Sequence, residues 1–307
     1  MSQTSRNDAA PLVLAIGQFD GVHRGHQAVF GAAVAAAERL GGTPACLTFQ
    51  PHVAQLLDPA RAPLLLATPE QNQALIAACG IRQIHVFPFT REFAAMGPAE
   101  FLSLLKMEFP NLAEIAVGEN FTFGKDRAGN RATLPDLAAA VGLRAQIVPH
   151  VAWAGAPISS TRVRAAVIAG DLPLAKALLG RAFALSGTVV HGRAVGRSLG
   201  FPTANVRPDL PIRPAPGIYA ARLRLHDGEH PGAAFVPDPA DPGQAHFGRV
   251  VEIHVPGLAR NLYDLQVEVA FTRRLRGHVA FPDAAAAAAQ IGRDVQAALA
   301  ADAEEQP

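Results

Sequence analysis

The sequence predicts an α/β domain with a parallel sheet, followed by an antiparallel β domain that ends in a helix. Three observations carry this prediction. The chain has 307 residues, which corresponds to two domains of about 150 residues each. Short apolar runs alternate with helical patterns over the first 150 residues. After Gly180 the pattern changes to extended segments separated by turn signals.

Five apolar runs in the first half are typical of buried parallel strands: residues 11–16, 44–49, 84–87, 114–117 and 144–148. Between the first two, residues 26–40 carry apolar side chains at helical spacing and stop at Gly41 and Gly42. Repeated strand–helix–strand units predict a sheet covered by helices on both faces. In such sheets ligands bind beyond the carboxyl ends of the strands, which is where the polar motifs of this half fall.

The second half begins with two predicted short helices, residues 162–169 and 172–179. Four extended segments follow, residues 187–191, 218–225, 250–255 and 265–271. In the last of these we expect a shared buried face that consists of Leu265, Val267, Val269 and Phe271. Asp283 is expected to cap a terminal helix that runs through six alanines, and residues 301–307 are expected to fray.

The composition excludes several classes of protein. Half of the residues are hydrophobic and 17% are charged, which argues against a disordered chain. The formal net charge of +1 provides no overall field for nucleic acid or an anionic membrane. Cys46 and Cys79 are too few for a disulfide framework or a four-cysteine zinc site, and we expect reduced core thiols. Residues 1–10 lack a secretory signal, and no apolar run approaches the roughly 18 residues that span a bilayer. We therefore expect a cytoplasmic protein.

Residues 17–26 join the first predicted strand to the first helix, a place where backbone N–H groups and the helix dipole favour an anion. Gly21 and Gly25 allow a sharp turn or close approach to a ligand. His23 and His26 stand three apart and could donate hydrogen bonds to phosphate oxygens. The turn is therefore a candidate polyphosphate site, and a capped loop without a ligand is the alternative. Neither the P-loop pattern nor the dinucleotide fingerprint occurs in the sequence.

Four motifs stand in order along the chain: residues 17–26 (G-x-F-D-G-x-H-x-G-H), 118–124, 158–164 and 200–205. Together they make the sequence similar to the bifunctional prokaryotic riboflavin kinase/FAD synthetases, members of the H-x-G-H nucleotidyltransferases. The resemblance extends from about Leu12 to Leu299. It implies a Rossmann-like nucleotidyltransferase domain over residues 10–180 and a β-barrel over residues 181–300. The partners that it implies are the small molecules ATP, riboflavin and FMN, with no nucleic acid and no membrane.

For the first domain, the resemblance implies transfer of AMP from ATP to the phosphate of FMN, giving FAD and pyrophosphate. His23, His26 and Arg164 would act on the transferring phosphate. The other nucleotide-binding residues implied are Gly17, Phe19, Gly21, Gly25, Asn120, Ser160 and Thr161. Taken alone, residues 159–161 are more typical of a helix cap. His52 is a candidate flavin contact, with a surface histidine as the alternative.

For the barrel, the resemblance implies phosphorylation of riboflavin by ATP with Mg²⁺. Thr203 and Asn205 would hold Mg²⁺ through hard oxygen donors. The implied phosphate loop consists of Gly196, Arg197 and Gly200. Glu252 would be the catalytic base, in an E-x-H pattern completed by His254. Ordinary turn chemistry at residues 202–205 and an exposed strand glutamate are the alternatives.

Three segments depart from the family pattern on the expected flavin side of the barrel. Residues 236–242 replace N-I-G-x-x-P-T, Leu262-Tyr263-Asp264 replaces L-Y-G, and Leu275-Arg276-Gly277-His278 replaces L-R-x-E. Two alternatives therefore stay open, an FMN adenylyltransferase with a degenerate kinase barrel and a non-catalytic flavin- or nucleotide-binding protein. The retained histidine pair argues against the second, because a binder has no need of groups that stabilise a transition state.

Overall fold

The computed structural model of the chain describes residues 10–192, 195–242, 244 and 248–305. Residues 1–9, on which we expected no signal segment, lie outside the described part. Contacts divide the chain into two compact units. The first contains Met1–Pro63 and Pro69–Ser159, and the second contains Leu64–Thr68 and Ser160–Pro307. The domain ranges 10–180 and 181–300 remain predictions.

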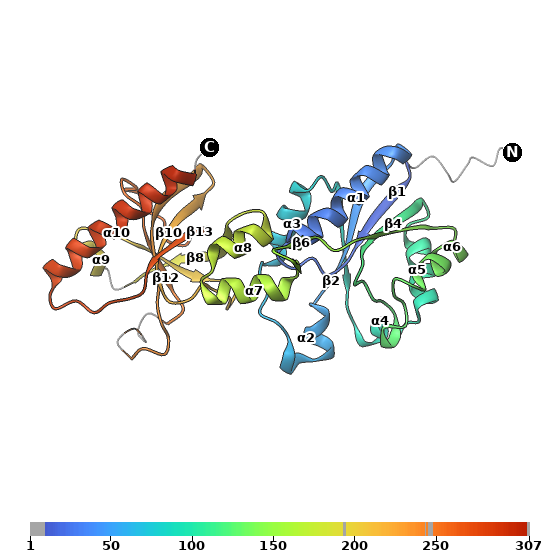
Figure 1. The fold of residues 1–307 in the computed structure, drawn as a ribbon, viewed down its shortest axis with the longest axis horizontal. Coiled ribbons are helices and arrows are strands. Elements are labelled where there is room, and N and C mark those ends of the chain that lie inside the picture. The colour runs from blue at the N-terminus through green and yellow to red at the C-terminus, as the bar shows by residue number, and fades with distance from the viewer. Residues whose placement is uncertain (1–9, 193–194, 243, 245–247, 306–307) are drawn as a thin grey trace. The chain divides into compact units, whose positions relative to one another are not determined.

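The first unit contains a five-stranded sheet in the order β3-β2-β1-β4-β5, in which all neighbouring strands run parallel (Figure 1). The strands are β1 (Leu12–Ile16), β2 (Thr43–Gln50), β3 (Gln83–Pro88), β4 (Leu112–Gly118) and β5 (Arg144–Val148). All five predicted strands are confirmed. This order is that of doubly wound nucleotide-binding folds, and it makes β1 and β4 neighbours at the point where the order reverses.

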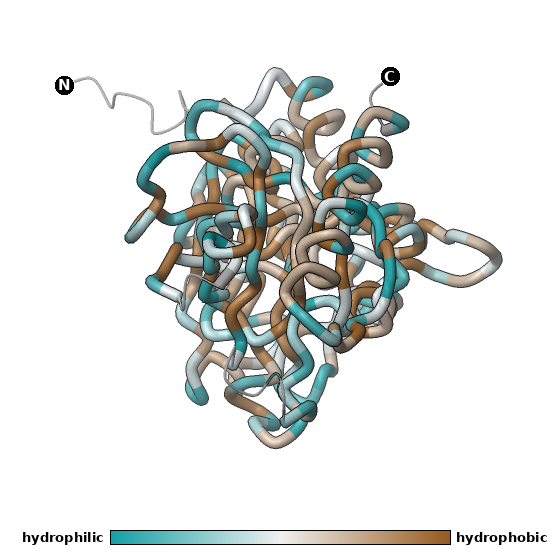
Figure 2. Tube along the Cα trace, turned by 90° about the vertical axis from the view of Figure 1, so that its left-hand side faces the viewer, coloured by the Kyte–Doolittle hydropathy of each residue, from teal (hydrophilic) through white to brown (hydrophobic). Residues whose placement is uncertain are grey.

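The sheet is covered on both faces, as predicted. Side chains of β1 alternate between two hydrophobic clusters: Leu12, Leu14 and Ile16 belong to one, and Val13 and Ala15 to the other. The first cluster includes residues of α5 (Pro98–Glu108) and α6 (Leu134–Ala140), and the second includes residues of α1 (Arg24–Leu40) and α3 (Pro69–Ala78). Figure 2 shows brown, hydrophobic stretches alternating with teal, hydrophilic ones along the trace.

Helix α1 starts two residues before the predicted position because His23 caps it, and it ends as predicted at Gly41, whose φ of 61° is left-handed. The remaining elements of the first unit are α2 (Val53–Leu57), α4 (Arg91–Ala94), the 3₁₀ turns η1 (Pro59–Arg61) and η2 (Lys125–Arg127), and the hairpin of β6 (Ala152–Trp153) and β7 (Ala156–Pro157).

The second unit contains a closed barrel in the strand order β10-β11-β12-β9-β8-β13, with antiparallel neighbours. The strands are β8 (Phe183–Val190), β9 (Ala204–Pro208), β10 (Gly217–Leu225), β11 (Gly228–Val236), β12 (Val251–His254) and β13 (Gln266–Arg276). The helices are α7 (Ser160–Ala169), α8 (Leu172–Leu179), α9 (Val195–Ser198) and α10 (Ala284–Glu305). The antiparallel domain, the barrel and the terminal helix are confirmed.

Two strands of the barrel were not predicted. β9 begins within residues 202–205, for which we expected metal ligands or ordinary turn chemistry and no strand. In β11 a proline and two glycines interrupt the alternation of apolar residues. Glycine is needed at position 232 for a steric reason: a Cβ there would lie 2.1 Å from the backbone oxygen of His254 on the neighbouring strand.

Two details of the predicted barrel are wrong. Leu265 precedes β13 and is 41% exposed, so it does not share the buried face of the strand. The chain does not fray from residue 301, because α10 continues to Glu305. Near its end, Asp302 is buried and accepts a hydrogen bond from Arg222 of β10. At its start, the predicted cap is confirmed, since Asp283 Oδ1 accepts a hydrogen bond from Ala286 N at 2.8 Å.

The buried pair between Asp302 and Arg222 is expected to stabilise the barrel. We predict that Asp302→Ala lowers the free energy of unfolding of the second unit by about 2 kcal/mol, the usual loss for a charge-assisted hydrogen bond. Chemical denaturation measures this. Glu304→Ala is the matched control on the same helix: its carboxylate pairs with Arg273 but is 64% exposed, so a loss of under about 1 kcal/mol is expected. Equal losses for the two variants would contradict the structural role of Asp302.

The two cysteines differ in burial. Cys46 is fully buried in the sheet, and desolvation raises the pKa of its thiol, which makes it inert. Cys79 is half-buried and packs against the hydrophobic cluster that contains Cys46, so it lies at the edge of the core. Among the residues that the structure describes, no helix is long and apolar enough to cross a membrane.

Candidate active sites

The turn between β1 and α1 is held by hydrogen bonds at its backbone. Gly21 has a left-handed φ of 75°, and its N–H donates to Asn72 Oδ1 of α3 at 2.9 Å. Gly17 N–H donates to the carbonyl of Leu47 at 3.1 Å. Asn72 was not among the predicted residues, because nothing in its local sequence marks it as a partner of a turn 51 residues away.

His23 and His26 lie together at the N-terminus of α1, as the sequence predicted. Their rings are stacked with centroids 3.6 Å apart. His23 is the N-cap, and its Nδ1 accepts a hydrogen bond from His26 N at 3.3 Å. Because Nδ1 accepts, the proton of a neutral His23 ring is on Nε2, which gives this buried residue a donor nitrogen. A Cβ on Gly25 would lie 3.0 Å from the His23 ring, so the glycine leaves space for the His23 side chain to cap the helix.

Phe19 is a supporting residue in the core. It is 4% exposed and packs against Phe30 and, edge to face, against His26, with centroid distances of 4.4 and 5.2 Å. A Cβ on Gly17 would lie 3.0 Å from the Phe19 ring. Gly17 and Phe19 therefore shape the turn and position the imidazole of His26.

The turn has the chemistry of an anion site. Two imidazoles stand at the N-terminus of a 17-residue helix, whose dipole favours negative charge. Arg24 adds a cation at the first helical position, and its guanidinium lies 5.6 Å from the centre of the Trp153 ring. The alternative of a capped loop without a ligand describes His23 correctly, because His23 caps α1. It does not explain the stacking of His23 on His26 or the presence of Arg24 beside them.

Asn120 follows β4 at the carboxyl edge of the sheet and belongs to an exposed polar cluster. Its Oδ1 accepts a hydrogen bond from His150 Nε2 at 2.8 Å. The neighbouring Glu119 pairs with Arg131 at 2.5 Å and with His150 at 3.9 Å. Because β1 and β4 are adjacent strands, this cluster lies at the same sheet edge as the histidine turn. His52 caps α2, accepting a hydrogen bond from Ala54 N at 3.2 Å, which gives it a structural role.

Ser160, Thr161 and Arg164 lie on α7 in the second unit. The helix begins at Ser160, two residues before the predicted start, so the hydroxyls occupy its first turn. Arg164 Nε donates to the carbonyl of Leu64 at 2.6 Å. The action of these three residues together with His23 and His26 remains a prediction.

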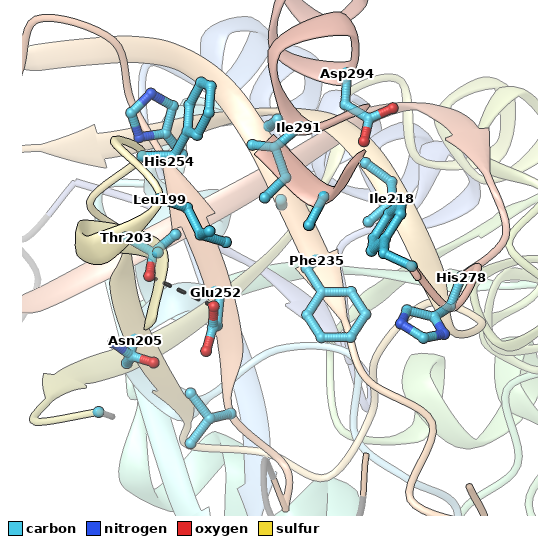
Figure 3. A pocket seen from close by; sticks show the side chains of 18 of the residues that line it. Leu199, Thr203, Asn205, Ile218, Phe235, Glu252, His254, His278, Ile291 and Asp294 are labelled. Atoms are coloured by element: carbon cyan, nitrogen blue, oxygen red, sulfur yellow. Dashed lines mark hydrogen bonds between the residues drawn. The ribbon is translucent and has the colours of Figure 1, made fainter. Parts of the chain in front are cut away.

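A pocket of about 770 Å³ lies on the barrel (Figure 3). Three of its lining residues form a row across neighbouring strands: Asn205 of β9 pairs with Glu252 of β12, and Glu252 pairs with Phe235 of β11. Side chains directly opposite on adjacent strands share a face of the sheet, so the strand pairing itself sets this row. The predicted alternation of β12 is confirmed, since Glu252 and His254 line the pocket and Val251 and Ile253 do not.

The polar end of the pocket contains the predicted metal and base residues. Thr203 Oγ1 donates to Glu252 Oε2 at 3.4 Å. Burial raises the pKa of Glu252, and the hydrogen bond from Thr203 opposes this in part. Asn205 is 8% exposed, and a Cβ on Gly192 would lie 2.5 Å from its amide atoms. The alternative that Glu252 is an exposed strand residue is wrong, because its side chain is partly buried and lines the pocket.

The predicted phosphate loop folds back on itself beside this end. Phe201 N donates to Gly196 O at 2.7 Å, and a Cβ on Gly196 would lie 2.4 Å from Phe201 O. Gly200 has a φ of 89°, and its N–H donates to the carbonyl of Arg197. Gly196 lines the pocket; residues 193–194 lie outside the described part of the chain. Contact of Gly196, Arg197 and Gly200 with a phosphate stays a prediction.

His254 has a structural role that the sequence did not indicate. Its Nδ1 donates to the carbonyl of Pro202 at 2.7 Å, and its ring packs edge to face on Phe201. It therefore ties the loop before Thr203 to β12, the strand that carries Glu252. The part of the pocket formed by β11 and α10 (Phe235, Ile291, Asp294) was also missed, because only the closed barrel brings these elements together.

Comparison with known sequences matches both halves of the chain. The family profile described as FAD synthetase matches residues 5–162, and the one described as riboflavin kinase matches residues 179–301. A Pseudomonas fluorescens protein named bifunctional riboflavin kinase/FMN adenylyltransferase is 34% identical, covering 94% of this chain and 92% of that one. Proteins of the same name from Escherichia coli K12 and Bacillus subtilis are 34% and 30% identical, covering 92% and 96% of this chain and 90% and 93% of their own lengths.

A solved structure extends the likeness to the fold. A Streptococcus pneumoniae protein titled a macrolide-efflux protein is 27% identical, with a TM-score of 0.81 over 94% of this chain and 93% of that one. A Rossmann-like α/β unit followed by a closed antiparallel barrel defines the class of proteins that join these two domains in one chain. The chain belongs to the bifunctional riboflavin kinase/FMN adenylyltransferase family.

Proposed function

We propose that the chain makes FMN from riboflavin and ATP, and then FAD and pyrophosphate from FMN and a second ATP. The observation that supports this proposal is that one chain contains two separate groups of polar side chains suited to phosphate chemistry. One is an imidazole pair at the start of α1, and the other is a carboxylate with two oxygen donors in the barrel pocket. We assign adenylyl transfer to residues 10–180 and phosphorylation to residues 181–300, as the sequence predicts.

In the barrel, Glu252 is the catalytic base. It accepts the proton of the riboflavin 5′-hydroxyl while that oxygen attacks the γ-phosphorus of ATP, and ADP leaves. Its raised pKa makes the carboxylate a better proton acceptor than an ordinary glutamate. Thr203, whose hydroxyl donates to Glu252, holds this side chain beside the proposed phosphate end of the pocket.

The residues of the pocket fit Mg²⁺ as the partner of ATP. Thr203 and Asn205 offer a hydroxyl and a carboxamide oxygen, the hard donors that Mg²⁺ prefers, and phosphate and water complete its coordination. The missing side chain at Gly192 leaves space beside the Asn205 amide. The ion would neutralise charge on the transferring phosphate, while Thr203 and Asn205 fix where that phosphate lies.

In the α/β domain, the phosphate of FMN attacks the α-phosphorus of ATP in line, and pyrophosphate leaves. His23 and His26 donate to the α- and β-phosphates, where negative charge increases in the transition state. The N-terminus of α1 contributes its dipole to the same charge. Ser160, Thr161 and Arg164 complete the phosphate contacts, with Arg164 acting as the permanent cation, and Asn120 holds the nucleotide.

The pH dependence of the kinase reaction follows from Glu252. Below the pKa of the base the carboxyl is protonated and cannot accept a proton, so kcat/KM for riboflavin rises with pH through that pKa. Because burial raises it, we expect the acid limb at a pH above the roughly 4.3 of an ordinary glutamate. Initial rates at saturating ATP and Mg²⁺ across pH 4–8 measure the limb. A limb at or below about 4.3 contradicts the assigned role.

Chromatography of the flavins tests the proposal against both alternatives. Riboflavin, ATP and Mg²⁺ should give FMN and then FAD. FAD from added FMN but no product from riboflavin selects the adenylyltransferase with a degenerate barrel. Absence of FAD and FMN in both incubations, with flavin still bound, selects the non-catalytic binder.

A further inference from the structure

The pocket on the barrel has two chemically different ends (Figure 3). Thr203, Asn205 and Glu252 gather at one end, Phe235 lies directly across from Glu252 on the neighbouring strand, and His278 lies on the far side of Phe235. The rings of Phe235 and His278 have centroids 5.7 Å apart and are tilted by 37°. If the 5′-hydroxyl of riboflavin meets Glu252, the ring system at the far end of the ribityl chain extends toward these two rings.

The aromatic end contains no unpaired charge among its described residues. Arg276 forms two hydrogen bonds to Asp294, from Nε at 2.9 Å and from Nη2 at 2.6 Å. Gln290 donates to the same carboxylate at 2.9 Å. An aromatic surface without an unpaired charge fits the isoalloxazine ring of a flavin, which carries no phosphate and needs no cation.

The hydrogen bonds of Gln244 set the tautomer of a neutral His278 ring. Gln244 is 3% exposed, and its Oε1 accepts from the backbone N–H of Asp238 at 2.9 Å. This sets the orientation of the amide, so the NH₂ group faces Asp241 Oδ2 at 2.5 Å and His278 Nδ1 at 3.1 Å. Both protons of that group are then used, one on each partner. His278 Nδ1 is therefore an acceptor, and the ring of a neutral His278 carries its proton on Nε2.

We propose that His278 determines flavin specificity, with its Nε2–H donating to a carbonyl oxygen or ring nitrogen of the isoalloxazine. The inference rests on the proposed kinase reaction and adds to it the group that recognises the ring. Gln244 is the positioning residue, because it keeps Nδ1 as the acceptor. Phe235 provides the apolar surface beside the same ring.

Lumiflavin, an isoalloxazine without the ribityl chain, tests the contact directly. Quenching of its fluorescence by the full-length protein measures binding without any turnover. We expect His278→Phe, which keeps an aromatic ring but has no donor, to weaken lumiflavin binding about fivefold, typical of one lost hydrogen bond at a partly exposed site. His226→Phe, the same change on an exposed turn of the barrel, should leave it unchanged.

Two further variants separate recognition from structure. His278→Gln retains an N–H donor and should recover most of the lost affinity. Gln244→Met should weaken lumiflavin binding, and the double variant with His278→Phe should be no weaker than His278→Phe alone, because Gln244 acts through His278. In turnover, His278→Phe should raise KM for riboflavin and leave kcat and KM for ATP unchanged.

The outcomes distinguish this inference from the proposed function. If the wild type makes FMN from riboflavin while His278→Phe binds lumiflavin as the wild type does, the role of His278 is wrong and the kinase assignment stands. A folded His278→Gln variant that binds as poorly as His278→Phe also overturns the role. If the wild type makes no FMN, the proposed kinase reaction itself fails.

Discussion

Glu252→Gln is expected to lower the rate of FMN formation from riboflavin by a factor of about 10²–10⁴, the usual contribution of a general base. The amide has nearly the size of the carboxyl group and still offers an oxygen to Thr203, so the row across β9, β12 and β11 is retained. It cannot accept the proton of the 5′-hydroxyl. The loss should therefore fall on kcat, with little change in KM for riboflavin.

The second reaction of the same variant serves as an internal control. FAD formation from added FMN is assigned to residues 10–180, which do not include Glu252, and should proceed at the wild-type rate in Glu252→Gln. Glu304→Gln, on the exposed side of α10, should leave both reactions unchanged. A Glu252→Gln variant that phosphorylates riboflavin within a few-fold of the wild type excludes Glu252 as the base.

His26→Ala is expected to lower adenylyl transfer by about 10² or more, the typical cost of removing one preorganised donor to a developing charge. The ring is held in place by the stack on His23 and the edge of Phe19, so the donor needs little reorganisation during the reaction. FMN formation from riboflavin by the same variant should be unchanged. Turnover near the wild-type rate with ATP still bound would show that His26 has no catalytic role.

His23 needs a different substitution because it has two roles. Alanine would remove the helix cap together with the imidazole, whereas asparagine is among the best N-cap residues. His23→Asn should therefore keep the thermal stability of the first unit while lowering adenylyl transfer. Loss of stability without loss of rate would identify His23 as a cap and nothing more.

The inner strands β1, β2 and β4 could be predicted because they are buried on both faces and form nearly continuous apolar runs, whereas the edge strands β3 and β5 are only partly buried and contain shorter apolar runs. The barrel was less visible in the sequence. β11 contains Pro231 and Gly232, which have low strand propensity, and its place is set by pairing with β10 and β12. The end of α10 was predicted to fray because its charges suggested solvent, but Asp302 pairs with Arg222, 80 residues away in the sequence.

The candidate sites also contain some features that local sequence predicts and others that depend on distant contacts. His23, His26, Thr203, Asn205 and Glu252 stand in short motifs, so their residue types could be recognised locally. The residues that hold these side chains in place could not be recognised from the sequence, because their contacts join distant segments. Examples are the contact of Asn72 with Gly21 and that of His254 with the loop before Thr203. The same holds for the aromatic end of the pocket, which exists only once β11, β13 and α10 are packed.

The most direct test of the two-reaction account follows the phosphorus atoms of ATP. Purified protein is given riboflavin and Mg²⁺ with ATP labelled at either the γ- or the α-phosphate, and the flavins are separated over time. The account predicts that γ-label enters FMN first and then FAD, whereas α-label enters FAD alone as pyrophosphate is released. Flavins that carry neither label after prolonged incubation would contradict it.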